Sequence, residues 1–255
     1  MYRFLLRPKW ILSHLLVLTL IIVMINLCLW QVRRLDEKKD RNALIVSQTK
    51  IAPVSVADLA SLGPHQVEYR QVTMTGRYDT SKEVAVKNRT FNGAPGRDLV
   101  TPLVPSDGGR AILVLRGWMP QAVTDVTAPF DDVAPPAGPV TVTGWLMPTE
   151  PVPALGHENP FISDSEVSRL AIREIAKRRA IDTGDVYLQM ESQTPASASS
   201  RLTLVPLPEL DEGPHFSYAV QWAIFSAIAA GGYLLILRKM ARQPYHATGE
   251  VAERS

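Results

Sequence analysis

The uncharged stretch from Tyr218 to Leu237 constrains the fold of this chain more than any other feature. About 20 apolar residues in helical form span the roughly 30 Å hydrocarbon core of a bilayer. The flanks agree with such a span, because Tyr218 and Trp222 lie near one end, where interfacial aromatic residues are common. The other end is closed by basic residues: Arg238, Lys239 and Arg242. We predict a transmembrane helix over 215–237, with His215 at its aromatic end.

Small residues recur at every fourth position of this predicted helix. They are Ala219, Ala223, Ala227 and Gly231. Their spacing predicts one helix face that another membrane helix can approach closely.

A second uncharged run, from Ile11 to Trp30, precedes the rest of the chain. It is followed by QVRRLDEKKDR rather than by a small-x-small cleavage site. The bulky Leu27 before Cys28 also argues against a lipoprotein signal. We therefore predict an uncleaved first transmembrane helix over 11–30, with Asn26 hydrogen-bonded to the second helix.

Charges around the second helix predict its orientation. Acidic residues precede this helix and basic residues follow it, which places the C-terminus in the cytoplasm. Two spans then place the N-terminus there too, although the first helix has basic residues on both sides and does not decide the matter alone. We expect a cytoplasmic N-terminus (1–10), a first span (11–30), an extracytoplasmic domain (31–214), a second span (215–237) and a cytoplasmic tail (238–255).

The central segment has the pattern of a β-rich domain. Apolar and polar residues alternate with period two, and most of the chain's 20 prolines lie between 53 and 214. The predicted strands are 67–74, 83–88, 99–104, 111–118, 140–146 and 186–190, with turns at 91–98 and 107–109. Pro102 suggests that strand 99–104 is short or at an edge. The fold class expected is a membrane protein of the α+β type, with two transmembrane helices flanking an external, mostly antiparallel β-rich domain.

One or two short helices are expected in that domain. Ser163 and Glu166 form a Ser-x-x-Glu capping box, which predicts a helix over 161–180. Its expected buried face consists of Val167, Leu170, Ala171 and Ile175. The basic residues Arg173, Lys177, Arg178 and Arg179 then form either a solvated helix end or a contact with anionic headgroups. A continuation of the first helix over 31–46 and a short helix over 56–62 are also predicted.

The composition excludes several functions. The formal net charge is only +2, so nothing indicates nucleic acid, and the single Cys28 excludes an intrachain disulfide and CxxC or CxxCH chemistry. GxSxG, HExxH, P-loop and GxGxxG motifs are absent, so we do not expect an enzyme. Four arginines of the central segment form either a patch for propionates or phosphates or ordinary strand surface. They are Arg77, Arg89, Arg97 and Arg116.

Of the histidines, His215 has two open interpretations, as an interfacial anchor or as an iron ligand. An imidazole beside a helix–helix groove can reach a haem iron while a lipophilic tail lies in the groove. His14 should lie about 25 Å away along the bilayer normal, so the two cannot share a metal. His65, His157 and His246 lack metal-ligand spacing.

Six short stretches, in order across nearly the whole chain, resemble one known family. They are LCLWQVRR (27–34), GRYD (76–79), GRDLVTPL (96–103), LVLRGWMP (113–120), VTGWL (142–146) and PHFSYAVQW (214–222). Together they are similar to the surfeit locus protein 1 family of cytochrome c oxidase assembly factors. This sequence departs from the family pattern at Cys28, at Gly213-Pro214 and at Ala223.

The resemblance implies a role in the maturation of haem-copper oxidases, with oxidase subunit I and the haem a synthesis machinery as partners. It implies a bacterial plasma membrane location and haem a as a transient cofactor. By resemblance, His215 is the metal ligand, and Trp30, Gln31 and Trp222 belong to the same cofactor site.

Three hypotheses follow. The first is an assembly factor that assists haem a insertion into subunit I. The second is a scaffold without cofactor, whose small-residue face docks on an oxidase helix. The third is a membrane-anchored hydrolase, which requires paired catalytic side chains at a pocket in the central domain.

Overall fold

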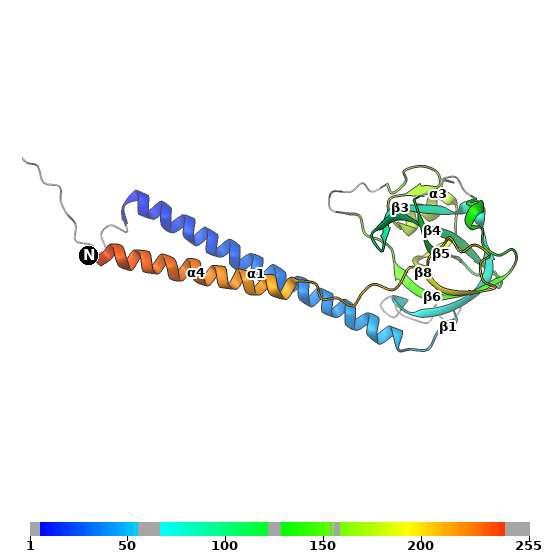
Figure 1. Cartoon of the computed structure of the whole chain (residues 1–255), viewed down its shortest axis with the longest axis horizontal. Helices are drawn as coiled ribbons and strands as arrows, with labels where there is room; N and C mark the ends of the chain where they lie inside the picture. Colours follow the sequence, from blue (N-terminus) through cyan, green and yellow to red (C-terminus); the bar gives the residue numbers. More distant parts are fainter. Residues whose placement is uncertain (1–5, 56–66, 122–128, 154, 156–158, 243–255) are drawn as a thin grey trace, which may run out of the picture. The chain divides into compact units, whose positions relative to one another are not determined.

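The computed structural model describes residues 6–55, 67–121, 129–153, 155 and 159–242. The chain divides into two compact units, which are described separately below (Figure 1). A helical unit contains the chain up to Ala43 and from Leu210 onward, and a β-rich domain contains Leu44–Glu209.

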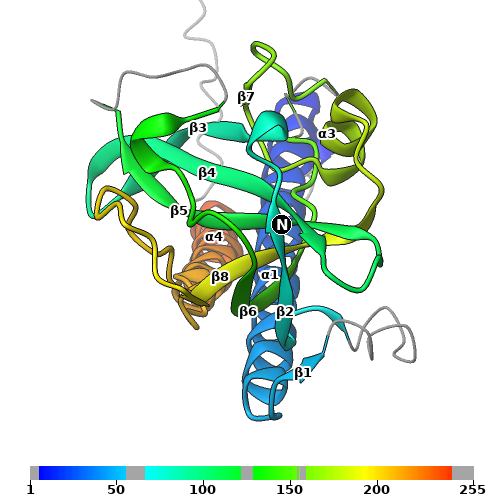
Figure 2. The same cartoon turned by 90° about the vertical axis from the view of Figure 1, so that its right-hand side faces the viewer.

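The β-rich domain is built on one eight-stranded sheet. Its strands are β1 (Val54–Ser55), β2 (Gln71–Tyr78), β3 (Val84–Phe91), β4 (Ala94–Pro105), β5 (Ala111–Pro120), β6 (Val140–Pro148), β7 (Glu166–Val167) and β8 (Thr183–Thr194). The order is β1-β2-β6-β8-β5-β4-β3-β7, and an additional pairing of β2 with β4 closes the inner five strands into a barrel. Figure 2 shows these strands curling around one another.

The sheet is mixed, so the expectation of a mostly antiparallel sheet is only partly right. The hairpins β3–β4 and β4–β5, and the pairs β2–β6 and β6–β8, are antiparallel. In contrast, β1–β2, β3–β7 and β5–β8 are parallel. The last of these arises because β8 returns, after the helix α3 (Ile172–Arg179), between β5 and β6.

Successive side chains of β5 point alternately into two hydrophobic cores. Ile112 and Val114 point into the barrel, where they pack with Val72, Leu103 and other apolar side chains of the ring strands. Leu113 and Leu115 point to the other side, into a cluster that includes Ile172 and Ile175 of α3. The strand is therefore buried on both faces, as its continuous apolar sequence predicted.

Strand β4 is longer than expected. The turn before it contains only Asn92 and Gly93, both with positive φ as a two-residue hairpin turn requires, and Ala94 already begins the strand. Pro102 does not mark an edge. On one side of β4, the residues before Pro102 pair with β3 and those after it pair with β2. Its carbonyl accepts a hydrogen bond from the Asp79 N–H in this gap, so the missing proline N–H interrupts no ladder.

The helix predicted over 161–180 is shorter than the capping box suggested. Glu166 and Val167 form β7 beside β3, and the helix begins only at Ile172, without a side-chain cap. The carboxylate of Glu166 instead pairs with Lys87 and Arg97. The four apolar residues expected on the helix face are all buried, but mostly by the loop and β7. The helix predicted over 56–62 lies outside the described residues.

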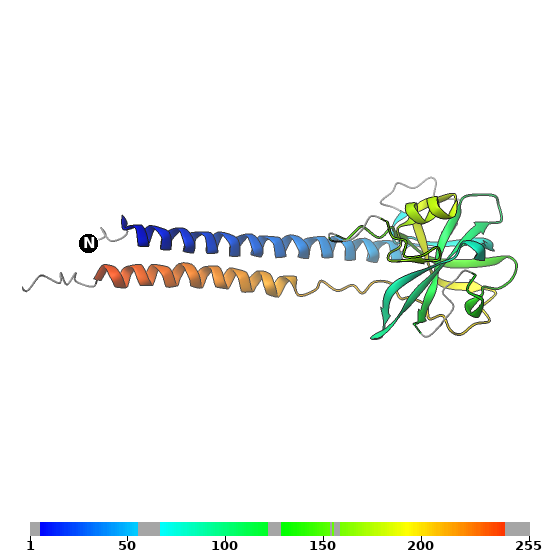
Figure 3. The same ribbon diagram turned by 90° about the horizontal axis from the view of Figure 1, so that it is seen from above.

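The helical unit contains α1 (Pro8–Thr49) up to Ala43 and α4 (His215–Arg242). The helices run side by side and antiparallel (Figures 1 and 3). Both are long and apolar enough to cross a membrane. The predicted continuation of the first helix through 31–46 is confirmed, and its last turn, from Leu44, belongs to the β-rich domain, whose core buries Ile45.

Candidate functional site

The two helices meet along a regular seam. Half-buried and buried positions recur at alternating steps of four and three residues, the spacing that keeps one stripe of each helix facing a partner. On α1 they are Trp10, His14, Val17, Ile21, Met24, Cys28, Gln31 and Leu35. On α4 they are His215, Ala219, Trp222, Ser226, Ala229, Tyr233 and Leu237.

His215 lies at one end of this seam and contacts Gln31. Its Nδ1 is 2.7 Å from Gln31 Oε1, and the Gln31 side chain is only 8% exposed. Gly213, two residues before His215, adopts φ +68°, and a Cβ there would lie 3.4 Å from the imidazole ring. The Pro214 carbonyl accepts hydrogen bonds from the Ser217 hydroxyl and the Tyr218 N–H, which stabilise the first turn.

This contact determines which nitrogen of His215 is available. An amide oxygen can only accept, so Nδ1 carries the proton and donates to Gln31. In the neutral ring, Nε2 then presents its lone pair, and no hydrogen-bond partner for it is found among the described residues. A ring nitrogen oriented through the other nitrogen is the usual arrangement of a metal-binding histidine.

The aromatic residues expected at this site are arranged differently. Trp30 is adjacent to Gln31 but 47% exposed on the surface of α1. Trp222 is on the seam, two helical turns along α4 from His215, with its ring edge-on to Phe225 at 6.0 Å. The structure thus brings Gln31 and His215 together. It places Trp30 beside the pair and Trp222 about 10 Å further along the helix.

These residues suit an iron porphyrin better than a bare metal ion. Among the described residues, no three His, Cys, Asp or Glu side chains are grouped to hold a metal. A porphyrin supplies four nitrogen ligands itself and needs only an axial imidazole from the protein. The small seam residues Ala219, Ser226 and Ala229, with exposed apolar side chains around them, also suit a lipophilic ligand.

One other expectation for the helices is wrong. Asn26 does not bridge the helices, because its amide donates to the Ile22 carbonyl of its own helix. The small residues predicted to form a face for another membrane helix are divided in their burial: Ala219 is buried in the seam, while Ala223, Ala227 and Gly231 are exposed. Steps of four residues rotate by about 40° on a helix with 3.6 residues per turn, so the stripe leaves the seam.

A polar contact that the sequence did not predict lies at the other end of the seam. Tyr233 OH is 2.7 Å from His14 Nδ1 and 3.0 Å from Ser13 Oγ. The signal that could have found it is the heptad spacing, which places His14 and Tyr233 on the two facing stripes.

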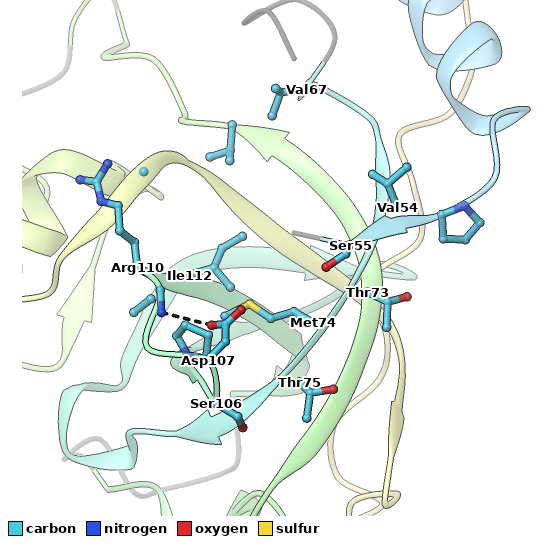
Figure 4. A pocket seen from close by; sticks show the side chains of 16 residues that line it. Val54, Ser55, Val67, Thr73, Met74, Thr75, Ser106, Asp107, Arg110 and Ile112 are labelled. Carbon is cyan, nitrogen blue, oxygen red and sulfur yellow. Dashed lines mark hydrogen bonds between the residues drawn. The ribbon is translucent and has the colours of Figure 1, made fainter. Parts of the chain in front are cut away.

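The β-rich domain has a groove of about 880 Å³ at the mouth of the barrel (Figure 4). Its floor is apolar, with Val54, Val67, Met74, Ile112 and Val186 among the lining residues. The charged residues of the described lining are already engaged, since Asp107 accepts from the Gly109 N–H and Arg110 pairs with Asp182. This described lining contains no histidine and no nucleophile–base pair such as the hydrolase hypothesis requires.

Buried charges in the domain are matched to one another. Arg116, 1% exposed, donates to Glu83 at 3.1 Å and to the Val133 carbonyl at 2.7 Å. The carboxylate of Glu83 also accepts from the Thr101 hydroxyl and the Phe130 N–H. Burial raises the pKa of Glu83 and lowers that of Arg116, and these contacts oppose both shifts.

The four arginines considered as an anion patch do not form one. Arg116 and Arg97 are buried, Arg89 pairs with Asp98 and Glu150, and only Arg77 is exposed. The basic end of α3 is similarly occupied, because Arg173 pairs with Asp185, Arg178 with Asp164, and Arg179 donates to the Glu83 carbonyl.

Together these features define a class of protein: an antiparallel pair of apolar helices with an oriented histidine, separated in the sequence by a β-barrel domain. The chain belongs to the SURF1 family, whose model matches residues 18–227. The resemblance seen in the sequence is therefore confirmed.

Known relatives cover most of the chain. An uncharacterised SURF1-like protein of Mycobacterium tuberculosis (strain H37Rv) is 29% identical over 238 residues, which is 90% of this chain and 83% of the relative. Surfeit locus protein 1 of Rattus norvegicus is 28% identical over 236 residues, covering 84% of this chain and 72% of the relative. The cytochrome oxidase assembly protein SHY1 of Saccharomyces cerevisiae is 34% identical over 93 residues, 35% of this chain and 23% of the relative.

Proposed function

We propose that this protein is a membrane-embedded assembly factor for cytochrome c oxidase that holds haem a through His215 and assists its insertion into subunit I. Membership of the SURF1 family and the similarity to a yeast cytochrome oxidase assembly protein support the first part. The observation that carries the second part is the hydrogen bond between His215 Nδ1 and Gln31, which leaves Nε2 available to iron.

In this proposal α1 and α4 span a bacterial plasma membrane, with both termini in the cytoplasm and the domain outside. The acidic residues before α4 and the basic residues after it support this orientation. The His215–Gln31 pair then lies at the outer edge of the bilayer. Haem a there would present an iron that accepts one axial nitrogen, and a tail that partitions into hydrocarbon.

Each residue of the site has a separate task. Gln31 orients the imidazole and fixes its tautomer, so that Nε2 would be presented to the iron. Arg33, which is exposed two residues after Gln31, is placed to meet a propionate at the bilayer surface, whereas Arg34 already pairs with Glu37. Trp30, exposed beside the pair, offers an aromatic surface to a flat ligand.

The test is the optical spectrum of the full-length protein, purified in detergent from cells that make haem a. We expect a haem a band that weakens in His215→Ala and keeps its full strength in Gln221→Ala, a control at an exposed position of the same helix. A band of equal strength in His215→Ala would contradict haem binding by this histidine. Co-purification of subunit I is measured in the same samples, and its absence from the wild-type protein would contradict the assembly role.

A second candidate function, a scaffold without cofactor, is favoured by a different observation. Ala223, Ala227 and Gly231 are exposed on the side of α4 that α1 does not use, where a helix of subunit I could pack closely. Ala223→Leu should then reduce co-purification of subunit I and leave haem binding intact. Ala219→Leu, within the seam, should instead separate the helices and reduce haem binding.

A further inference from the structure

The end of the helix pair opposite His215 contains a second imidazole held in the same way. His14 on α1 contacts Tyr233 on α4 through Nδ1, just as His215 on α4 contacts Gln31 on α1. Each helix therefore contributes one histidine, and the other helix contributes the group that orients it. The pairs are 18 residues apart along α4, or about 27 Å at 1.5 Å per residue.

The Tyr233 hydroxyl lies 3.0 Å from Ser13 Oγ and 2.7 Å from His14 Nδ1. When its single proton is donated to Ser13, its oxygen accepts from Nδ1–H of His14, and Nε2 of the neutral ring presents its lone pair. No hydrogen-bond partner for Nε2 is found among the residues that the structure describes.

The surroundings of His14 suit a flat, apolar ligand. The Trp10 ring lies 6.4 Å from the imidazole, and the Tyr233 ring meets it edge-on at 5.7 Å. The outward side chains next to His14 and Tyr233 are apolar and exposed, among them Ile11, Leu15 and Leu234. With no second metal-binding side chain grouped there within the described chain, a bare ion would find a single ligand.

Basic residues border this end as they border the other. Lys9 lies five residues before His14, and Arg238 lies five residues after Tyr233, both exposed and toward the same end of the pair. At the other end, the exposed Arg33 lies two residues after Gln31. A ligand with carboxylates on one edge and an apolar body would be accommodated at both ends, with its carboxylates at a membrane surface.

We propose that His14 is the axial ligand of a second site for a lipophilic iron porphyrin, at the end of the helix pair opposite His215. The identity of this porphyrin as haem a rests on the proposed function, but the site itself does not. The two histidines are too far apart to share one iron, so the chain has two separate porphyrin-binding sites. In a bilayer these would lie near opposite surfaces.

The experiment titrates full-length protein in detergent with ferric protoporphyrin IX and follows the Soret band. Four forms are compared: wild type, His14→Gln, His215→Gln and the double variant. Glutamine can still hydrogen-bond the facing side chain but gives iron no imidazole, and circular dichroism checks that the helices persist. We expect about two equivalents bound by the wild type, one by each single variant and none by the double variant.

Other outcomes separate this proposal from the proposed function. One equivalent in the wild type and in His14→Gln, with none in His215→Gln, would mean that His14 only connects the two helices. It would contradict the second site and support the His215 site. One equivalent in the wild type that only His14→Gln removes would support the second site and contradict the first. Tyr233→Phe should weaken binding at the His14 site alone by about 10- to 100-fold, because the orienting partner is lost; an unchanged affinity would overturn the proposed role of Tyr233.

Discussion

The two units use polar side chains in opposite ways. In the β-rich domain, the guanidinium of Arg116 and the carboxylate of Glu83 are buried and hydrogen-bonded to one another and to neighbouring groups. In the helical unit, each seam histidine has one nitrogen hydrogen-bonded, and no partner for the other is found in the described part of the chain. The difference suggests that the polar groups of the domain hold its fold, whereas those of the helix pair are prepared for a ligand.

The sharpest test on the domain side breaks its buried ion pair. Arg116→Met would leave the Glu83 carboxylate without its cation at 0% exposure, and we expect a loss of about 3–5 kcal/mol in the free energy of unfolding. The measurement is denaturant unfolding of the full-length protein in detergent. The exposed pair Arg201–Asp132 provides the control, since Arg201→Gln should cost less than about 1 kcal/mol. Equal effects of the two changes would contradict the conclusion that buried polar groups hold the fold of the domain.

A pH effect should come from Asp98. Burial raises the pKa of its carboxyl to about 6; the Arg89 guanidinium at 3.0 Å opposes this shift and Glu150 adds to it. The unfolded chain releases this proton near pH 4, whereas the folded protein keeps it until about pH 6. Stability should therefore fall as pH rises from about 4 to 6, by roughly 2–3 kcal/mol from this group.

Asp98→Asn isolates that contribution, because it keeps the size of the side chain and cannot ionise. The melting temperature of the full-length protein should fall less between pH 4 and 7 in Asp98→Asn than in the wild type. Asp182→Asn, at an exposed carboxylate, is the matched control and should leave the pH profile unchanged. An identical profile for wild type and Asp98→Asn would contradict the raised pKa.

On the helix side, the decisive change is Gln31→Leu. It removes the acceptor that orients His215, and we expect haem affinity to fall by about 10- to 100-fold, with little effect on unfolding of the domain. Gln31→Glu should retain affinity, because a carboxylate also accepts from Nδ1–H. If both variants bound haem as the wild type does, the imidazole would not depend on Gln31.

The smallest effect is expected at the end of α3. Arg173 and Asp185 are both well exposed although they form two hydrogen bonds, so Arg173→Ala should leave the free energy of unfolding nearly unchanged. A larger loss, measured in the same denaturant assay, would mean that surface pairs contribute to the fold as buried ones do.

Elements with strong periodicity could be predicted from the sequence. Both long helices and the strands predicted over 83–88, 111–118, 140–146 and 186–190 were found where expected, whereas the strand predicted over 67–74 begins at Gln71 and continues to Tyr78. The helix at 161–180 was not, because Glu166 is held by Lys87 and Arg97, which are distant in the sequence. Parallel pairing of β5 with β8 was also missed, since strand order depends on the path of the intervening chain.

The candidate site was predicted in part. His215 was named from its position at the start of the second span and Gln31 only on the family resemblance, and no local pattern shows that residues 184 positions apart are hydrogen-bonded. The small-residue stripe illustrates a different limit. Residues spaced by four follow a line that winds slowly around the helix. Which of them are buried depends on where the partner helix packs, so Ala219 is buried while Ala223 is exposed.

Pairing the first helix with the last has a consequence for biosynthesis. Gln31 emerges from the ribosome 184 residues before His215, and His14 emerges 219 residues before Tyr233. At about 5–20 residues per second, each histidine pair stays incomplete for roughly 10–40 s after its first member is made. Under the proposed function, porphyrin capture would therefore wait for the completion of translation, and a chain that ends prematurely within the β-rich domain would have neither histidine pair.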